Sequence, residues 1–290
     1  MRGYLTLATG SPLYFEAAAN LALSVRLNDP SRPISLLCDD AKKLAPEYRE
    51  YFDQLIELPL HPTYSGCGDK IRMPLFSPYE ETIFIDSDCF IAKPDMDRHW
   101  EKMSAGFFGM PGGKVTTGSW YGKTIESMMA AEHVPYIVQM NSGVFYFKRS
   151  EALEQLVGQA METAEAEFSE VQISHRGVNE QLADEPIWGV LMASLAIEPV
   201  CYQPEEGSIS VSTYLAKHIE LDVFDGACQM KKSKGFYLLG RFFSKGWVQH
   251  SPSVPHFVAF GPRAQYLKAA NDLRKNFSLP SFSFPAETKP

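Results

Sequence analysis

Two aspartates separated by one residue are the sharpest chemical feature of the 290-residue sequence. Asp86-Ser87-Asp88 directly follows the apolar run 82–85 and precedes the apolar pair Phe90-Ile91. In open α/β sheets, ligands bind outside the carboxyl ends of the strands. Two carboxylates at such a desolvated strand end repel each other unless a cation joins them. A hard divalent cation prefers carboxylate oxygens and also binds substrate phosphates. We therefore favour a metal site here over two solvated loop aspartates.

The elements that must position these aspartates alternate between strands and helices. Residues 4–9, 34–38, 82–85 and 144–147 are short apolar runs typical of strands. Such strands, separated by helices, indicate a mostly parallel sheet. Ser11 is a good N-cap and Pro12 a good first helical residue, so a helix begins there and ends at Asn28-Asp29-Pro30. The sequence further predicts a short helix or turn over 69–75, helices over 150–168, 178–195 and 263–276, a loop-rich stretch over 106–123, and an irregular, aromatic-rich stretch over 200–262.

Composition excludes several classes of protein. The formal net charge of −8 gives no basic footprint for nucleic acid. The apolar runs are far shorter than the ~20 residues of a membrane span, and the N-terminus has no signal-peptide layout. The five cysteines form no C-x-x-C pair, which favours reduced thiols and a cytoplasmic location over a disulfide framework or a thiolate zinc site. An acidic protein of this kind needs local cations or a metal to bind a phosphate ligand.

Four stretches occur in an order and spacing that are typical of one family. They are residues 70–88, residues 5–9 with Tyr14, residues 140–145 and residues 256–262. Together they resemble family 8 glycosyltransferases, the glycogenin and galactosyltransferase group. The resemblance implies a single Rossmann-like α/β domain of the glycosyltransferase A fold over 1–276, with a mostly parallel central sheet. It implies a nucleotide-binding half at 1–105, an acceptor and donor-sugar half at 106–276, and we expect a flexible tail at 277–290.

The same resemblance implies a ligand set for the metal. Asp86 and Asp88 match the pair that binds manganese and the nucleotide diphosphate, with Ser87 between them, and His256 matches the third protein ligand. Mn²⁺ is the expected ion, with Mg²⁺ as the alternative, and imidazole suits a borderline transition metal. His250 competes with His256 for this role, and an ordinary core or loop histidine remains the alternative for both.

Further residues match positions around the donor in that family. Ala8, Thr9 and Tyr14 match positions near the nucleobase, Lys70 a basic residue near the phosphates, and Asn141 a residue near the donor sugar. Each has a plainer explanation. Tyr14 could serve helix packing, Lys70 could be a surface lysine, and Asn141 could be a turn former.

The sequence also departs from the family at the expected reaction centre. Asp184 matches an aspartate beside the anomeric carbon, but Glu185 replaces the glutamine that follows it. Two acids that begin a helix also have a plain electrostatic explanation. In the closing loop, Ala259 replaces a glycine and Pro262 a lysine, so the adjacent Arg263 is the expected partner of the leaving diphosphate.

These features predict a metal-dependent glycosyltransferase that moves a hexose from a nucleotide-diphosphate sugar to a hydroxyl acceptor. A UDP-sugar is the favoured donor, a sugar or glycoconjugate the expected acceptor, and the resemblance implies retention of configuration. One alternative is a non-catalytic relative that binds nucleotide sugars. The other is a sugar nucleotidyltransferase, against which the turn 10–13 counts because it carries no cation. The sequence specifies neither the donor sugar nor the acceptor, and it leaves open a homo-oligomer.

Overall fold

The computed structural model describes residues 1–59, 61, 68–166, 172–173, 181–203, 206–238 and 241–285. Its centre is a six-stranded sheet in the order β3-β2-β1-β4-β10-β5. Strands β3, β2, β1 and β4 are parallel, and β10 runs antiparallel to β4 and β5. The predicted mostly parallel α/β sheet is therefore confirmed. The strand bounds are Gln54–Glu57 for β3, Ile34–Cys38 for β2, Arg2–Ala8 for β1, Glu81–Ile85 for β4, Val144–Lys148 for β10 and Phe108–Gly109 for β5.

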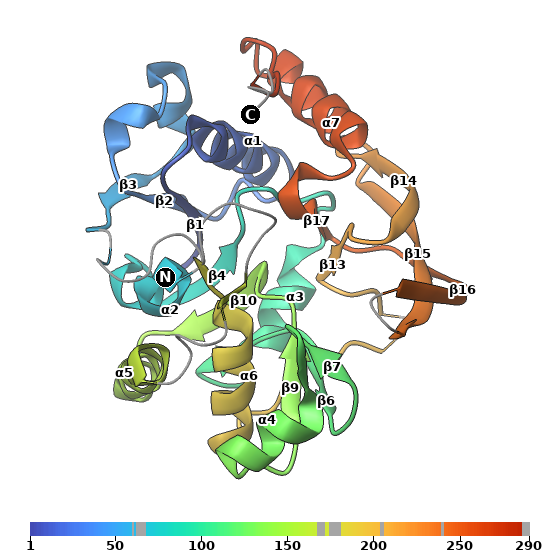
Figure 1. Cartoon of the computed structure of the whole chain (residues 1–290). Helices are drawn as coiled ribbons and strands as arrows, with labels where there is room; N and C mark the ends of the chain where they lie inside the picture. Colours follow the sequence, from blue (N-terminus) through green and yellow to red (C-terminus); the bar gives the residue numbers. More distant parts are fainter. Residues whose placement is uncertain are drawn as a thin grey trace.

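Both faces of this sheet are buried. Successive side chains of a strand point to opposite faces, so each strand contributes to the packing on both sides. On β4, Ile83 packs into a cluster with α1 (Pro12–Asn28) and α3 (Met96–Met103), whereas Phe84 packs toward α5 (Glu151–Ala166) and α6 (Asp184–Ser194). Figure 1 shows α1 on one side of the sheet and α5 and α6 on the other. Helix α1 begins where the sequence predicts, since Ser11 Oγ accepts a hydrogen bond from the Leu13 amide.

The C-terminal segment returns to the sheet. Strand β17 (Val254–His256) pairs in parallel with β13 (Ser210–Ser212), and α7 (Arg263–Asn276) packs against α1. Residues 281–285 contain Phe282, which is only 3% exposed beside Tyr266, so this part of the expected flexible tail is packed. Residues 286–290 lie outside the described part. Among the described residues, no helix has both the length and the apolar composition that crossing a bilayer demands.

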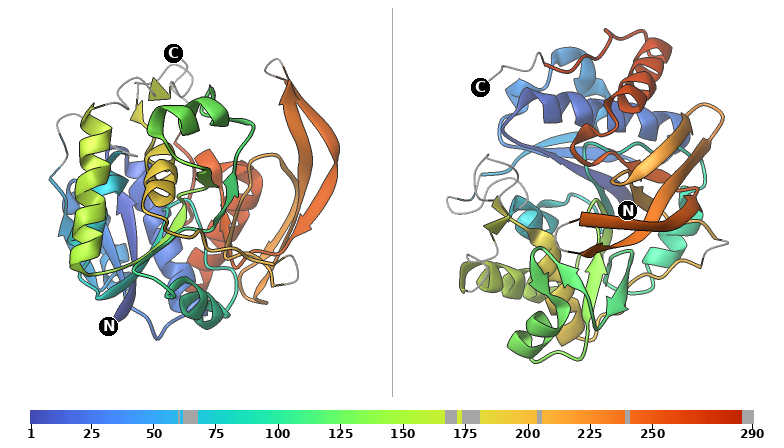
Figure 2. Two further views of the ribbon diagram at one scale, coloured as in Figure 1. Left: turned by 90° about the horizontal axis from the view of Figure 1, so that it is seen from below. Right: turned by 45° about the vertical axis from the view of Figure 1, so that its right-hand side comes forward.

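The prediction of an irregular stretch over 200–262 is wrong for a large part of it. Strands β14 (Ala216–Asp222), β15 (Ala227–Leu238) and β16 (Arg241–His250) form an antiparallel sheet that extends away from the body (Figure 2). Beyond Met230, the described side chains over 231–235 and 243–250 are exposed or half-buried, so this part of the sequence lacks the alternation of apolar and polar residues that marks a half-buried strand.

Other bounds also differ from the predictions. The helix predicted over 178–195 begins at Asp184, and residues 174–180 lie outside the described part. The stretch 106–123, predicted as loop-rich, contains short strands. Their backbone partners include distant segments such as β9, which local sequence does not reveal. The remaining elements are η1 (Ala41–Lys43), η2 (Pro46–Tyr51), α2 (Asp69–Arg72), η4 (Met73–Phe76), β6 (Gly112–Val115), β7 (Ser119–Trp120), β8 (Lys123–Thr124), α4 (Ile125–Glu132), β9 (Ile137–Met140), β11 (Gln172–Ile173), β12 (Gln181–Leu182) and η6 (Val258–Phe260).

Candidate active site

The loop that follows β4 is held from both sides by backbone hydrogen bonds. The Asp86 amide donates to Gly143 O at 2.8 Å, which fixes the loop to the segment before β10. The Phe257 amide donates to Asp88 O at 3.0 Å, and Cys89 and His256 form an isolated β-bridge. Strand β17 is thereby placed against the carboxyl end of β4, which brings His256 to the two aspartates.

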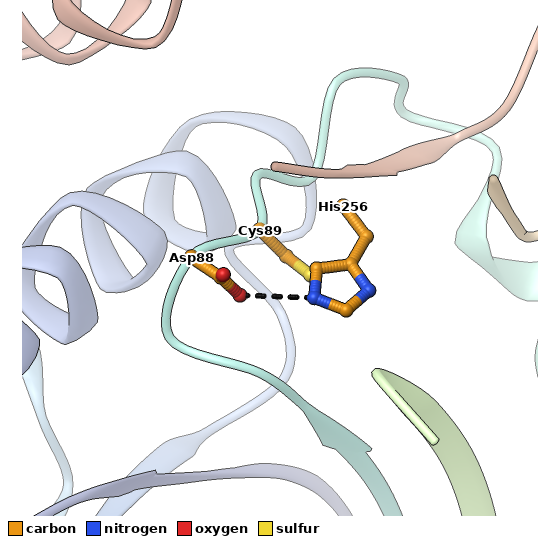
Figure 3. A group of neighbouring side chains, drawn as sticks. All are labelled: Asp88, Cys89 and His256. Carbon is orange, nitrogen blue, oxygen red and sulfur yellow. Dashed lines mark ion pairs between the residues drawn. The ribbon is translucent and has the colours of Figure 1, made fainter. Parts of the chain in front are cut away.

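Three side chains converge at this point. His256 Nε2 lies 3.1 Å from Asp88 Oδ1 and 3.6 Å from Asp86 Oδ2. Figure 3 shows the Asp88 carboxylate and the His256 ring facing each other. Lys70 on α2 donates from Nζ to Asp86 Oδ2 at 2.7 Å. The competitor His250 ends β16, opposite Met230, so the structure brings His256 and not His250 to the aspartates.

Asn141 fixes the tautomer and the orientation of His256. Its Oδ1 lies 2.6 Å from His256 Nδ1, while its Nδ2 donates to Glu185 Oε1 at 3.0 Å. The amide oxygen must therefore face the ring, so that Nδ1–H donates and the Nε2 lone pair is directed at the aspartates. Gly143 makes room for this arrangement, since a Cβ there would lie 2.4 Å from His256 Nδ1.

Glu185 accepts hydrogen bonds at both of its carboxylate oxygens. Oε1 accepts from Asn141 Nδ2 and from the Ser142 amide, each at 3.0 Å, and Oε2 accepts from the Tyr121 hydroxyl at 2.6 Å. Burial, followed by the negative charge of Asp184, raises the pKa of Glu185. Glu185 therefore supports Asn141, and through Asn141 it supports His256.

Asp184 begins α6 and is almost fully buried, at 3% exposed. Its Oδ2 atom has no hydrogen-bond partner among the described residues. Burial raises the pKa of Asp184, and the positive charge of Lys70 only partly opposes this. Buried polar atoms normally have a hydrogen-bond partner, so this oxygen is open to a group that the chain does not supply, as are oxygens of Asp39, Asp69 and Asp95.

The electrostatics of this site favour a divalent cation. Burial lowers the pKa of His256, but Asp88 and Asp86 outweigh that effect and raise it above its ordinary value. Cys89 Sγ, a His256 ring nitrogen and an Asp88 oxygen lie within 4.8 Å of one another, yet burial raises the pKa of the Cys89 thiol well above its ordinary value. The donors that remain are two carboxylates and one imidazole, whose Nε2 proton an ion would replace, a set that fits Mn²⁺ or Mg²⁺.

The residues expected around the nucleobase lie at the carboxyl ends of β1 and β2. Ala8 ends β1 and is paired with Cys38. The loops that follow are joined by Asp39 Oδ2, which accepts from the Gly10 amide at 3.0 Å and from Lys43 Nζ at 2.6 Å. Sequence reasoning missed Asp39 and Lys43, although an aspartate directly after a strand was a signal of the same kind as Asp86.

The other expected donor-side residues lie near aromatic rings. Tyr14 is 43% exposed, and its ring centroid lies 5.8 Å from that of Phe260. Arg263 begins α7, with its guanidinium 5.2 Å from the centroid of the Phe284 ring. Thr9 follows β1 directly, and Ser87 is buried between the two aspartates. The structure thus joins Lys70, Asp86, Asp88, Asn141, Glu185 and His256 through direct contacts, and places Ala8 and Thr9 at the same sheet edge.

Tyr121 connects this site to a neighbouring cavity of about 500 Å³. The cavity lies between α4 and the first turns of α6, and its walls include Trp120, Pro186 and Val190. Trp120 and Tyr121 fall in the stretch 106–123 that the sequence predicts as loop-rich, and as aromatics they could serve either sugar stacking or the core. Their role in walling a cavity depends on the return of α6, which local sequence does not show.

Comparisons with known proteins identify the fold. No protein-family model matches the chain, and no curated protein is significantly similar to it. Among solved structures, the WbbM bifunctional glycosyltransferase is 13% identical at a TM-score of 0.48, over 72% of this chain and 39% of its own. The glycosyltransferase GlyE of Streptococcus pneumoniae is 14% identical at a TM-score of 0.53, over 98% of this chain and 66% of its own. The galactosyltransferase LgtC, solved with donor and acceptor sugar analogs, is 12% identical at a TM-score of 0.51, over 98% of both chains.

At these identities the likeness carries the fold alone. The sheet order, its parallel strands and the match to GlyE and LgtC over nearly the whole chain agree with one another. Membership of family 8 stays a prediction. The chain has the α/β architecture of the glycosyltransferase A fold, and the solved structures that resemble it are glycosyltransferases.

Proposed function

We propose that this chain is a metal-dependent glycosyltransferase that moves a hexose from a nucleotide-diphosphate sugar to a hydroxyl acceptor. The observation that carries the proposal is the convergence of Asp86, Asp88 and His256 at the carboxyl end of β4. That edge is where α/β sheets bind their ligands. A UDP-sugar is the donor we favour, a sugar or glycoconjugate is the acceptor, and Mn²⁺ or Mg²⁺ is the ion.

Asp86, Asp88 and His256 Nε2 would hold the ion. When bound, such an ion would act as a Lewis acid on the leaving group of the donor. Without it the site is acidic, since Lys70 is the only lysine or arginine in contact with the two aspartates among the described residues. Binding of an anionic donor should therefore depend strictly on the divalent cation.

The other side chains of the site bind and orient. Lys70, held at Asp86, supplies positive charge where the leaving diphosphate gathers negative charge. Asp184 has a carboxylate oxygen without a donor, which suits it to stabilise the positive charge that develops on the donor sugar. Glu185 accepts hydrogen bonds at both of its oxygens and is therefore a positioning residue. This arrangement needs no enzyme nucleophile, in agreement with a front-face reaction that retains configuration.

The experiment that tests this function is donor turnover. The protein is incubated with a panel of UDP- and GDP-sugars and simple sugar acceptors, with Mn²⁺, with Mg²⁺ and with chelator. We expect hydrolysis or transfer of one donor with Mn²⁺, loss with chelator, and loss in Asp88→Asn. The matched control is Asp95→Asn. It changes an aspartate beside His99, a second buried histidine, and should keep activity. No turnover of any donor in Mn²⁺ would contradict the proposal.

Two further outcomes identify the alternatives. If calorimetry detects tight UDP binding that requires Mn²⁺ but no donor is consumed, the chain is a non-catalytic nucleotide-sugar-binding protein. Glu185 in place of glutamine and Pro262 in place of lysine are the departures that favour this alternative. If UTP and a sugar phosphate give pyrophosphate, the chain is a sugar nucleotidyltransferase.

A further inference from the structure

Strands β15 and β16 together form a ribbon that we call the basic ribbon, residues 227–238 and 241–250. Its sequence contains no Asp or Glu, although the whole chain has a net charge of −8. The ribbon extends away from the body of the molecule (Figure 2). Its basic residues are Lys231, Lys232, Lys234, Arg241 and Lys245. A strongly cationic segment in an acidic protein concentrates attraction for anions on one projecting element.

The register of the strands brings two positive charges face to face. Lys217 on β14 lies directly opposite Lys231 on β15, and both side chains are exposed. Like charges at directly opposite positions destabilise a sheet. The Lys217 ammonium also lies 5.1 Å from the centroid of the Trp247 ring, so the two lysines and this ring share one face of the sheet. This pairing is unfavourable in water and becomes favourable when an anion lies over it.

Exposed apolar side chains occur on the same ribbon. Phe243, Trp247 and Val248 are 45%, 49% and 38% exposed. Trp247 is opposite Ser233 and Val248 is opposite Lys232, so consecutive positions place apolar surface on both faces. Apolar and cationic residues therefore lie on both faces of the ribbon.

We propose that the basic ribbon docks on the surface of a bilayer that contains anionic phospholipid. Tryptophan favours the membrane–water interface, and lysine extends its ammonium to the headgroups while its stem lies on apolar groups. The exposed Trp247 beside the facing Lys217 and Lys231 therefore matches a surface that is both apolar and anionic. A second copy of the ribbon would add to the repulsion at Lys217 and Lys231. Docking of this kind is peripheral and needs no membrane-spanning helix.

The test is flotation of the full chain with vesicles. One set consists of phosphatidylcholine alone, and in the other about a third of the lipid is phosphatidylglycerol. We expect binding to the anionic vesicles only, and release as salt rises, because exposed charges are screened. The double variant Lys217→Glu with Lys231→Glu should lower the partition coefficient by roughly tenfold or more. The matched control is Lys42→Glu with Lys148→Glu, two exposed lysines outside the ribbon with the same change in net charge, and it should bind like the parent.

A second measurement locates the contact. Vesicles with brominated acyl chains should quench tryptophan fluorescence in the parent chain, and Trp247→Phe should remove most of that quenching. The other three tryptophans, Trp100, Trp120 and Trp188, lie in the body of the protein. Circular dichroism checks that each variant keeps the fold. We expect every variant to do so, because the substituted side chains are exposed.

Several outcomes would overturn the proposal. They are equal binding to both vesicle types, undiminished binding of the Lys217/Lys231 variant, unchanged quenching in Trp247→Phe, or binding to soluble polyphosphate without binding to vesicles. Assembly of the chain through the ribbon, seen as a concentration-dependent mass that the Trp247→Phe or lysine variants abolish, would also overturn it. Vesicle binding is measured without donor or acceptor, so its failure leaves the proposed transferase function untouched. Likewise, failure of the donor-turnover experiment leaves the proposed vesicle binding untouched.

Discussion

Two buried histidines show how one side chain takes opposite roles in this chain. His256 and His99 are 5% and 0% exposed. The ring nitrogens of His99 face hydroxyls, with Nε2 2.9 Å from Ser253 Oγ and Nδ1 3.0 Å from Tyr202 OH, while the nearest Asp95 oxygen is 4.0 Å away. Burial, followed by neighbouring positive charge, lowers the pKa of His99 to about 4. His99 is thus a neutral structural residue whose ring nitrogens are both satisfied.

His256 is surrounded by the opposite charge. Two carboxylates face its Nε2, and they raise its pKa although burial works against them. Lys70 balances only part of this negative charge. The difference teaches that burial alone does not mark a functional histidine. What marks it is a surplus of one charge that the described side chains leave unbalanced, which at His256 calls for a cation and at His99 does not arise.

The largest expected effect separates the two aspartates beside these histidines. Asp88→Asn removes one ligand oxygen and one negative charge, so we expect the affinity for Mn²⁺, measured by calorimetry, to fall more than about 100-fold. This exceeds the loss expected when a residue that only hydrogen-bonds to a metal ligand is changed. Asp95→Asn makes the same chemical change beside His99 and should leave Mn²⁺ affinity unchanged. Equal losses in the two variants would show that Mn²⁺ does not bind at Asp88.

The second effect concerns stability at acid pH. The unfolded chain protonates His99 near its ordinary pKa of 6.5, whereas the folded protein resists protonation until about pH 4. The unfolded state therefore binds more protons in this window, and the free energy of unfolding falls as the pH drops from 6.5 to 4, by about 3 kcal/mol. Urea unfolding at several pH values measures this. His99→Gln should flatten the curve over that window, and an unchanged slope would contradict the assignment of His99 as a buried neutral residue.

A third effect lies in the partner that orients His256. Asn141→Ala removes the acceptor of His256 Nδ1 and should weaken Mn²⁺ binding by about 10–100-fold. Asn28→Ala also removes two side-chain hydrogen bonds, to Ile91 O and Val223 O, and is the matched control. It should lower stability without changing Mn²⁺ affinity. A metal affinity that is insensitive to Asn141 would argue against a role for the tautomer.

The smallest effect is expected at Glu185. Glu185→Gln keeps an oxygen for Asn141 and Ser142, and the Tyr121 hydroxyl can turn to accept from the new amide, so we expect the free energy of unfolding to change by less than about 1 kcal/mol. Glu185→Leu leaves buried donors unpaired and should cost about 2 kcal/mol or more. If both variants lose the same stability, the negative charge of Glu185, and not its hydrogen bonds, is what holds the site.

The sequence predicts the part of the fold that follows from local patterns. Apolar runs and the Ser11-Pro12 start locate β1, α1, β2, β4 and β10, and a carboxylate pair directly after β4 indicates the sheet edge at which Asp86, Asp88 and His256 converge. The choice between His256 and His250 rests on a resemblance, because both are preceded by strand-like residues. Only the pairing of β17 with the loop after β4 separates them in space.

The rest depends on contacts that local spacing does not encode. Tyr121 and Ser142 reach Glu185 from segments that are distant in sequence, so their part in the site could not be predicted. The strands of the basic ribbon were missed for a different reason. Cys228 and Met230 are buried, but the described side chains over 231–235 and 243–250 are exposed or half-buried, so that part of the sequence shows little of the periodicity by which half-buried strands are recognised.

The return of β17 to the loop after β4 has a consequence for the order of folding. His256 and Asn141 are 115 residues apart in the chain, and contacts across such distances form late because closing a long loop costs entropy. Neighbouring strands such as β15 and β16 are close in the chain and can pair early. A partly folded chain thus can have its ribbon while it lacks the proposed ligand set. An ion held, as we propose, by Asp86, Asp88 and His256 would bind only molecules that have finished folding, and by mass action it would stabilise them by about 2.7 kcal/mol at a hundred times its Kd.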